Sequence, residues 1–190
     1  MPDYFEVAQP SMAMNDVRTP PNYLQFANTR RVEETDDVYE LFQNAASVMA
    51  AWQKNGTTNI SLAINCHGLV DSDEHGSFVG LQLGTGLNSD TVASVQAIQP
   101  YVQTIYLLAC YSASGSSGDI FCSKLASLAR AFVFASDTSQ GADRGVPTQV
   151  PFGYVPAYHG NIKQYSKKGQ VIYNGPWQGA TIHQKGYWEQ

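Results

Sequence analysis

A histidine and a cysteine at the ends of two apolar stretches are the residues of this sequence best suited to chemistry. His67-Gly68 follows the stretch 60–66, and Cys110 follows the stretch 104–109. A cysteine attacks as its thiolate, and a nearby histidine supplies the acid or base that acyl transfer requires. The pattern therefore predicts Cys110 as a nucleophile and His67 as a general acid and base.

Backbone donors for an oxyanion lie beside the same two residues. Gly68 has no side chain, so its N–H can come close to a developing negative charge. Cys110 stands where a strand is expected to turn into a loop, and its own N–H is the second candidate donor. We expect Gly68 and Cys110 to form the oxyanion hole.

Alternating strands and helices are predicted to position these residues. The stretches 60–66, 104–109 and 131–135 are short and apolar on both faces, which is typical of strands buried in a parallel sheet. Thr35 is expected to cap a helix up to Gly56, Ser89 a helix up to Pro100, and Asp119 is expected to open a third helix after a loop at 112–118. The pattern predicts a three-layer α/β fold, with a mostly parallel open sheet and helices on both faces. Ligands bind at the carboxyl ends of such strands, so His67 and Cys110 should share one rim.

The length of 190 residues predicts a single domain with three parts. Residues 1–22 carry Pro10, Pro20 and Pro21 and show little periodicity, so they are expected to be an irregular N-terminal arm. Residues 23–138 form the α/β core, with a short strand at 23–26 and a hairpin at 78–83. Residues 139–190 are predicted to be a β-rich C-terminal elaboration with a hairpin of 162–165 and 171–173.

Composition excludes several classes of function. The formal charge of -5 leaves no basic field for nucleic acid, and no apolar run approaches the roughly 20 residues of a membrane span. Three cysteines are too few for a disulfide scaffold, and the N-terminus lacks the features of a secretory signal. We expect a soluble protein that is cytoplasmic or exported by a route without a signal peptide.

The strand ends resemble the caspase–gingipain–separase clan of cysteine peptidases. Its signature is a hydrophobic strand ending in His-Gly and a later one ending in Ala-Cys, here Leu62-Ala-Ile-Asn-Cys-His-Gly68 and Ile105-Tyr-Leu-Leu-Ala-Cys110. The segments 80–84, 109–115 and 118–126 look most like bacterial members, including CHAT-type domains. The resemblance covers about residues 35–138. It implies a caspase-like fold and an endopeptidase which, as a bacterial effector or toxin-associated protease, would cleave a protein or peptide without a cofactor. In this dyad Cys110 attacks the scissile carbonyl and His67 protonates the leaving amine.

Three carboxylates are candidates for substrate binding. Asp71 and Asp73 lie close to His67 in the sequence and can line a pocket for a basic residue, and Asp119 can face the same pocket. The run 71–76 begins like a calcium loop but lacks its closing glutamate, so we expect no metal there. Cys66 and Cys122 are expected to be core residues, although the predicted place of Cys122 in the first turn of a helix keeps it as a minor candidate for reactivity.

Two alternatives to a peptidase remain open. The fold can serve as a catalytically inert interaction domain that binds a protein partner through its Gly- and Tyr-rich C-terminal part. The Cys–His pair can also act on a non-protein substrate as an amidase or acyltransferase. Loss of activity in Cys110→Ala and His67→Ala separates the enzymes from the binding domain.

Overall fold

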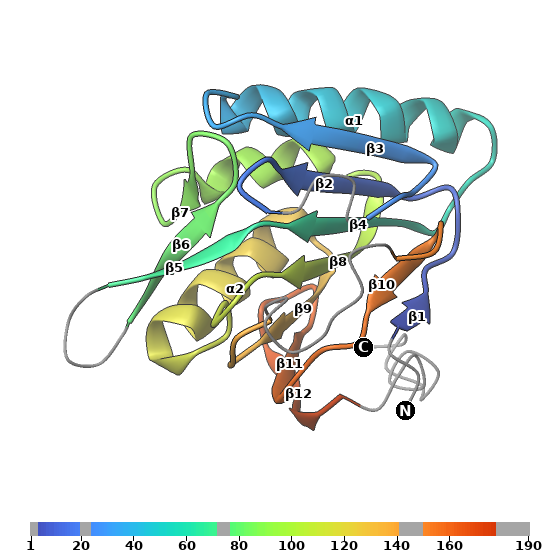
Figure 1. Ribbon diagram of the computed structural model, residues 1–190. Helices are drawn as coiled ribbons and strands as arrows, with labels where there is room; N and C mark the ends of the chain where they lie inside the picture. Colours follow the sequence, from blue (N-terminus) through green and yellow to red (C-terminus); the bar gives the residue numbers. More distant parts are fainter. Residues whose placement is uncertain (1–3, 20–23, 72–76, 141–149, 178–190) are drawn as a thin grey trace.

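The computed structural model describes residues 4–19, 24–71, 77–140 and 150–177, and its centre is a seven-stranded sheet (Figure 1). The strands are β2 (Met12–Asp16), β3 (Asn28–Val32), β4 (Ile60–Asn65), β8 (Val102–Leu108), β9 (Phe132–Ser136), β11 (Asn161–Tyr165) and β12 (Val171–Pro176). Their order is β12-β11-β9-β8-β4-β2-β3; the five strands from β9 to β3 are parallel, and β11 runs against both neighbours. The expected α/β class, the mostly parallel sheet and the three buried strands are confirmed.

The helices begin at residues other than those predicted. Helix α1 (Val38–Lys54) is capped by Asp37, whose carboxylate accepts the N–H groups of Tyr39 and Glu40, so Thr35 is not the cap. The second helix is a 3₁₀ helix, η1 (Val92–Ile98), which follows Thr91 rather than Ser89. Helix α2 (Gly115–Ala129) includes part of the expected loop, so Asp119 lies inside the helix and does not open it.

All three described helices pack on one face of the sheet, which corrects the expectation of helices on both faces. Met12 and Met14 of β2 belong to the hydrophobic cluster that contains the buried side chains of the helices. Ala13, between them, belongs to a second hydrophobic cluster on the opposite face of the sheet. That second cluster contains Leu24 and Phe26 from the β2–β3 connection, and side chains from β1 (Tyr4–Glu6) and β10 (Tyr154–Pro156). The second layer of cover is therefore made of connections and a two-stranded ribbon, and no helix of the described residues contributes to it.

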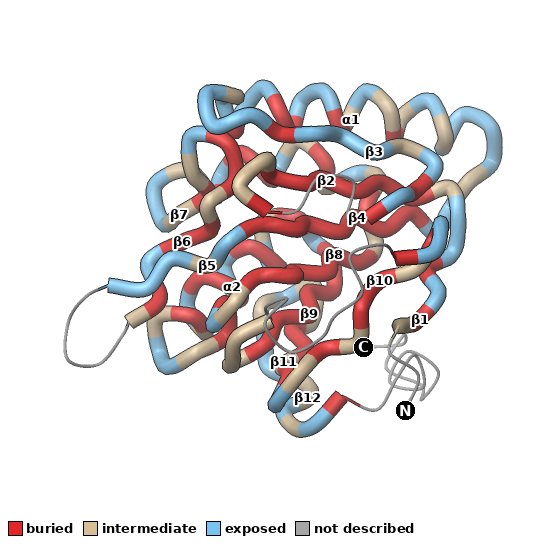
Figure 2. The backbone as a smooth tube through the Cα atoms, in the orientation of Figure 1, coloured by how far each residue is buried: buried red, intermediate tan, exposed pale blue. Residues whose placement is uncertain are grey.

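The N-terminal segment is part of the core, so the prediction of an irregular arm is wrong. Strand β2 lies between β4 and β3, and all five of its residues are buried (Figure 2). The strand expected at 23–26 is also incorrect: Tyr23 lies outside the described residues, Leu24–Phe26 form no strand, and β3 begins at Asn28. Parallel pairing of β2 with two neighbours stabilises a segment whose sequence has little periodicity.

A small antiparallel sheet projects from the carboxyl end of β4. It consists of β5 (His67–Val70), β6 (Phe78–Gln82) and β7 (Leu87–Asn88), in that order. The hairpin expected at 78–83 is present in part, because β6 pairs with both β5 and β7. Strand β4 ends at Asn65, close to the expected end at His67-Gly68, and His67 then begins β5, so the small sheet starts at the candidate catalytic histidine.

The C-terminal hairpin is confirmed as β11 and β12, and it extends the main sheet through β9. Register pairs Ile162 with Ser136 and Tyr165 with Val133. No helix in the described part of the chain is long and apolar enough to cross a membrane.

Candidate active site

The two strand ends that carry His67-Gly68 and Cys110 are neighbours. Strands β4 and β8 are parallel and adjacent, with Asn65 opposite Leu108, so the residues that follow lie at the same edge of the sheet. Gly68 packs directly on the Cys110 backbone: a Cβ at residue 68 would overlap the Cys110 carbonyl oxygen and lie 2.9 Å from the carbonyl carbon. Only glycine permits this approach. The packing brings together two of the residues that the sequence singled out.

Cys110 is half-buried, and its sulfur is held by the segment after β9. The Gln140 N–H donates to Cys110 Sγ at 3.2 Å, and Ser139 Oγ lies 3.6 Å from the same sulfur. The Gln140 side chain is in turn fixed by the His159 backbone, since its Nε2 donates to the His159 carbonyl at 3.0 Å and its Oε1 accepts the His159 N–H at 3.0 Å. A backbone N–H directed at sulfur is a donor that a thiolate uses better than a thiol does. Sequence reasoning missed Ser139 and Gln140, because nothing in their local pattern signals contact with Cys110.

The turn after Cys110 is held in an uncommon conformation. Tyr111 has φ 57°, in the left-handed region that bulky side chains rarely adopt. Two backbone bonds to the end of β9 fix it: Tyr111 N–H donates to Thr138 O at 3.0 Å, and Ala113 N–H donates to Ser136 O at 2.8 Å. Backbone strain of this kind persists where the surroundings enforce it, and it is common at functional sites. Here it turns the chain from β8 into α2 immediately after the candidate nucleophile.

His67 is exposed, and its ring is oriented by a backbone carbonyl. His67 Nε2 lies 2.9 Å from Arg18 O. Because a carbonyl only accepts, Nε2 carries the proton and Nδ1 is left to exchange protons. Within the part of the chain that the structure describes, no hydrogen bond joins His67 to Cys110. The imidazole and the thiol thus share the rim, but they are not engaged with each other in this state.

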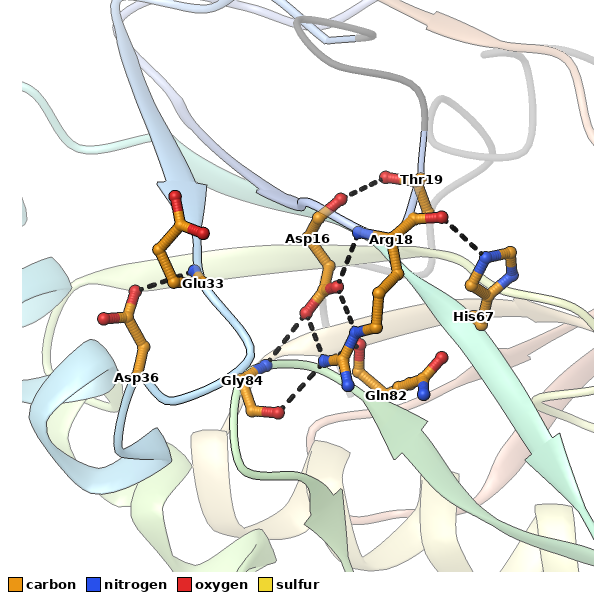
Figure 3. Close-up of polar contacts among 8 residues, drawn as sticks. All are labelled: Asp16, Arg18, Thr19, Glu33, Asp36, His67, Gln82 and Gly84. Atoms are coloured by element: carbon orange, nitrogen blue, oxygen red, sulfur yellow. Dashed lines mark hydrogen bonds and ion pairs between the residues drawn. The ribbon is translucent and has the colours of Figure 1, made fainter.

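A buried ion pair fixes the residue that orients His67 (Figure 3). Asp16 has a fully buried side chain and binds Arg18 through two bonds of 2.6 Å, one from Nε and one from Nη2. Arg18 Nη2 also donates to the carbonyls of Gln82 and Gly84 at 3.1 and 3.0 Å, and the Gly84 N–H donates to Asp16 Oδ2 at 2.9 Å. The network ties the end of β2 to the end of β6, the strand whose Gln82 pairs with His67.

The electrostatics of this pair follow from its contacts. Burial by itself would raise the pKa of the Asp16 carboxyl, but the Arg18 guanidinium and the N–H groups of Arg18 and Gly84 outweigh it and hold that pKa below the ordinary value. The hydrogen bond to Asp16 is the main reason that the pKa of Arg18 is raised. Both groups stay charged, so the network is a rigid support. Sequence reasoning missed this network. Its signal in the sequence is the Asp-x-Arg spacing of Asp16 and Arg18 at the end of β2, a strand that the sequence pattern did not predict.

The three carboxylates proposed for substrate binding have different surroundings. Asp71 is exposed and continues β5, with its N–H donating to Ser77 O at 2.8 Å. Asp73 lies outside the described residues. Asp119 pairs with Lys163 Nζ at 2.8 Å and accepts the Tyr165 hydroxyl at 2.6 Å, so it links α2 to β11.

Cys66 and Cys122 are buried, as the sequence predicted for core residues. Burial raises the pKa of both thiols well above the ordinary value. Cys122 lies inside α2 rather than in its first turn, and its thiol donates to Ser112 O at 3.1 Å. Neither is suited to nucleophilic attack, which leaves Cys110 as the accessible cysteine.

An apolar groove of about 400 Å³ lies between β6 and α2, lined by Phe78, Val79, Ser89, Ser117, Ile120, Phe121 and Lys124. Neither His67 nor Cys110 lines it. Among the described residues, no group of three His, Cys, Asp or Glu side chains is arranged to hold a metal ion.

Comparison of the chain with models of protein families, with curated proteins and with solved structures found no match.

Proposed function

We propose that the protein is a cysteine peptidase in which Cys110 is the nucleophile and His67 the general acid and base. The observation that supports this most is the packing of Gly68 against the Cys110 backbone. This contact lies just beyond the ends of the adjacent parallel strands β4 and β8, so a histidine and an accessible thiol lie at the edge where α/β sheets bind ligands. The resemblance of these strand ends to the caspase–gingipain–separase clan supports the same chemistry and a caspase-like form of the α/β fold.

The proposed reaction uses groups that surround Cys110. His67 takes the proton of the Cys110 thiol at Nδ1, and the resulting thiolate adds to the scissile carbonyl, whose oxyanion takes hydrogen bonds from the N–H groups of Gly68 and Cys110. Protonated His67 delivers its Nδ1 proton to the leaving amine, which departs and leaves a thioester on Cys110. Water, deprotonated by His67, then hydrolyses the thioester and restores the thiol.

The direction of the Gly68 N–H, which follows from the pairing of β5 with β6, supports its proposed role. Asp71 donates its N–H across the hairpin to Ser77 O, and N–H groups alternate along a strand. The register between β5 and β6 shifts by one residue after Leu69. Leu69 pairs with Gly80 and Val70 with Phe78, so Val79 of β6 is an extra residue with no partner of its own on β5. The alternation on β5 is therefore unbroken, and the N–H groups of Gly68 and Val70 point away from β6.

His67 must reach the substrate for this reaction. Its ring is held by Arg18 O in the state described, so the proposed reaction requires the side chain to rotate until Nδ1 faces the leaving group. Catalytic hydrogen bonds are often long in the absence of substrate and shorten in the complex. The missing His67–Cys110 bond is also the observation that favours the rival function, an inert binding domain.

A fluorogenic peptide library tests the proposal. Wild type should cleave a subset of peptides, while Cys110→Ala and His67→Ala should cleave none and unfold at the wild-type temperature. Cys122→Ala is the matched cysteine control and should retain the cleavage pattern. Cleavage that survives in Cys110→Ala would overturn the assignment of the nucleophile. Hydrolysis of small amides or esters without any peptide would favour an amidase or acyltransferase.

A further inference from the structure

Strand β5 begins at the candidate active site and is an edge strand of the small sheet. It pairs with β6 on one side, and its first residue is His67. On its other side, no residue in the described ranges forms a backbone ladder with it. Leu69 and Val70 are 40% and 43% exposed, although both are large and apolar, and Figure 2 shows the strand as exposed directly beyond the buried β4.

The edges of the main sheet have protection that β5 lacks. Strand β3 carries exposed Arg30 and Arg31, which pair with Asp36 and Glu33, and charged side chains of this kind oppose addition of another strand. Strand β12 ends in Gly175-Pro176, and proline has no N–H to donate to a ladder. Strand β5 contains neither a lysine, an arginine nor a proline. An unprotected edge with free N–H and C=O groups is suited to an extended polypeptide.

We propose that β5 binds the substrate as an added antiparallel strand, an inference that rests on the proposed peptidase function. The outward N–H of Gly68 binds the carbonyl of the scissile bond. The outward N–H of Val70 binds the carbonyl two residues earlier in the substrate, because outward groups recur every second residue and the two chains run in opposite directions. The substrate is thus an unfolded or extended segment, recognised first through its main chain.

Exposed apolar side chains next to the ladder add selectivity. Side chains of an added strand alternate between the two faces of the small sheet, where they meet Leu69 or Val70. Both are uncharged, so the substrate segment on the amino-terminal side of the cleaved bond should be apolar or β-branched.

The test compares two substitutions of Val70 in the Cys110→Ala protein, which binds without cleaving. Val70→Pro removes the outward N–H but leaves the bonds to β6, whereas Val70→Ala keeps the N–H and shortens the side chain. The probe is a library of random 12-residue peptides passed over each immobilised protein. Retention should fall about tenfold in Val70→Pro, which loses one hydrogen bond and blocks the edge, and at most about threefold in Val70→Ala. Equal retention by the two variants, or no retention by Cys110→Ala, would overturn the proposal.

Three further measurements keep the result unambiguous. Hydrogen exchange at the Val70 amide of the Cys110→Ala protein should slow when the retained peptides are added; unchanged exchange contradicts the ladder, even if Val70→Pro fails to fold. Alkylation of Cys110 in the otherwise wild-type Val70→Pro protein reports on the catalytic pair separately. If Val70→Pro is alkylated at the normal rate and cleaves as wild type does, the β5 proposal alone is wrong. If Cys110 of the wild type is alkylated slowly, the proposed peptidase function is wrong.

Sedimentation tests whether the β5 edge binds a second copy of the chain instead of a substrate. A dimer that dissociates in the Val70→Pro variant would assign the edge to that second copy and overturn the proposal.

Discussion

The carboxyl edge of the sheet has two corners of opposite character. At the end of β2, the buried Asp16 and the half-buried Arg18 are charged and bonded to each other and to the backbone of Gln82 and Gly84. At the end of β8, Cys110 is half-exposed, and its sulfur accepts the backbone N–H of Gln140. The first corner uses its charges to hold the fold, whereas the second leaves a thiol within reach of solvent. His67 connects them, since the first corner orients its ring and the proposed reaction uses its proton at the second.

The largest contrast should come from cysteine substitution in the two environments. Cys110→Ala is expected to reduce peptide cleavage by at least about 10⁴-fold, the usual scale for loss of a nucleophile, with an unchanged free energy of unfolding. Cys122→Ala should do the reverse: full cleavage, but a loss of stability of about 1–2 kcal/mol, because it leaves a small void in the core. Urea unfolding and cleavage rates on the same samples measure both. The comparison fails if the two variants behave alike.

The ion pair should dominate the stability of the first corner. Asp16→Ala leaves the Arg18 guanidinium without its partner in a largely buried site, which costs about 3–5 kcal/mol. Asp36→Ala removes the partner of the more exposed Arg30 and should cost less than about 1 kcal/mol. Urea denaturation compares them. Similar losses would mean that the Asp16–Arg18 network is not the support described.

Gly68→Ala tests the contact that joins the strand ends. The new methyl group collides with the Cys110 carbonyl, so we expect a loss of about 1–3 kcal/mol and a displaced Cys110. Gly86→Ala is a useful control, because its Cβ would meet open space and only its left-handed φ of 114° is strained, at a cost of about 1 kcal/mol. Heat denaturation gives the stabilities. An alanine at position 68 without effect on stability or on Cys110 labelling would refute the close packing.

Acid should weaken the first corner by a smaller amount. The folded pKa of Asp16 lies below its ordinary value of 3.8, so its ionised form stabilises the fold above about pH 4, and this contribution disappears as the pH falls through the folded pKa. Asp16→Asn removes the titrating group, and its stability should vary less with pH between about 5 and 2. Chemical unfolding across this range provides the test. Parallel pH profiles for the two proteins would contradict the assignment.

Local sequence pattern was sufficient for the buried strands and insufficient for the edges and caps. Strands β4, β8 and β9 were predictable because both faces are covered, so their sequences are continuous apolar runs. Strand β2, Met-Ala-Met-Asn-Asp, ends in polar residues that bond groups far away in the sequence: Asn15 accepts from the Asn65 amide, and Asp16 accepts the Gly84 N–H. The segment 112–118, expected to be a loop, is rich in small residues because the chain packs closely on itself there. A Cβ at Gly118 would lie 2.8 Å from the Ala113 carbonyl carbon, which is too close for a larger residue.

The candidate site divides in the same way. His67, Gly68 and Cys110 were predictable because strand ends in a parallel sheet converge. The residues that hold them come from elsewhere in the chain: Arg18 is 49 residues from His67, and Gln140 is 30 residues from Cys110. Contacts at such separations leave no local pattern in a single sequence.

The most direct test of the central claim is the rate at which iodoacetamide alkylates Cys110 as a function of pH, in wild type and in His67→Ala, followed by peptide mapping. A tuned pair predicts fast and selective labelling of Cys110 well below pH ~8.5, the ordinary range of a free thiol, and slower labelling in His67→Ala. Slow labelling of Cys110 that is identical in the two proteins would contradict the catalytic pair.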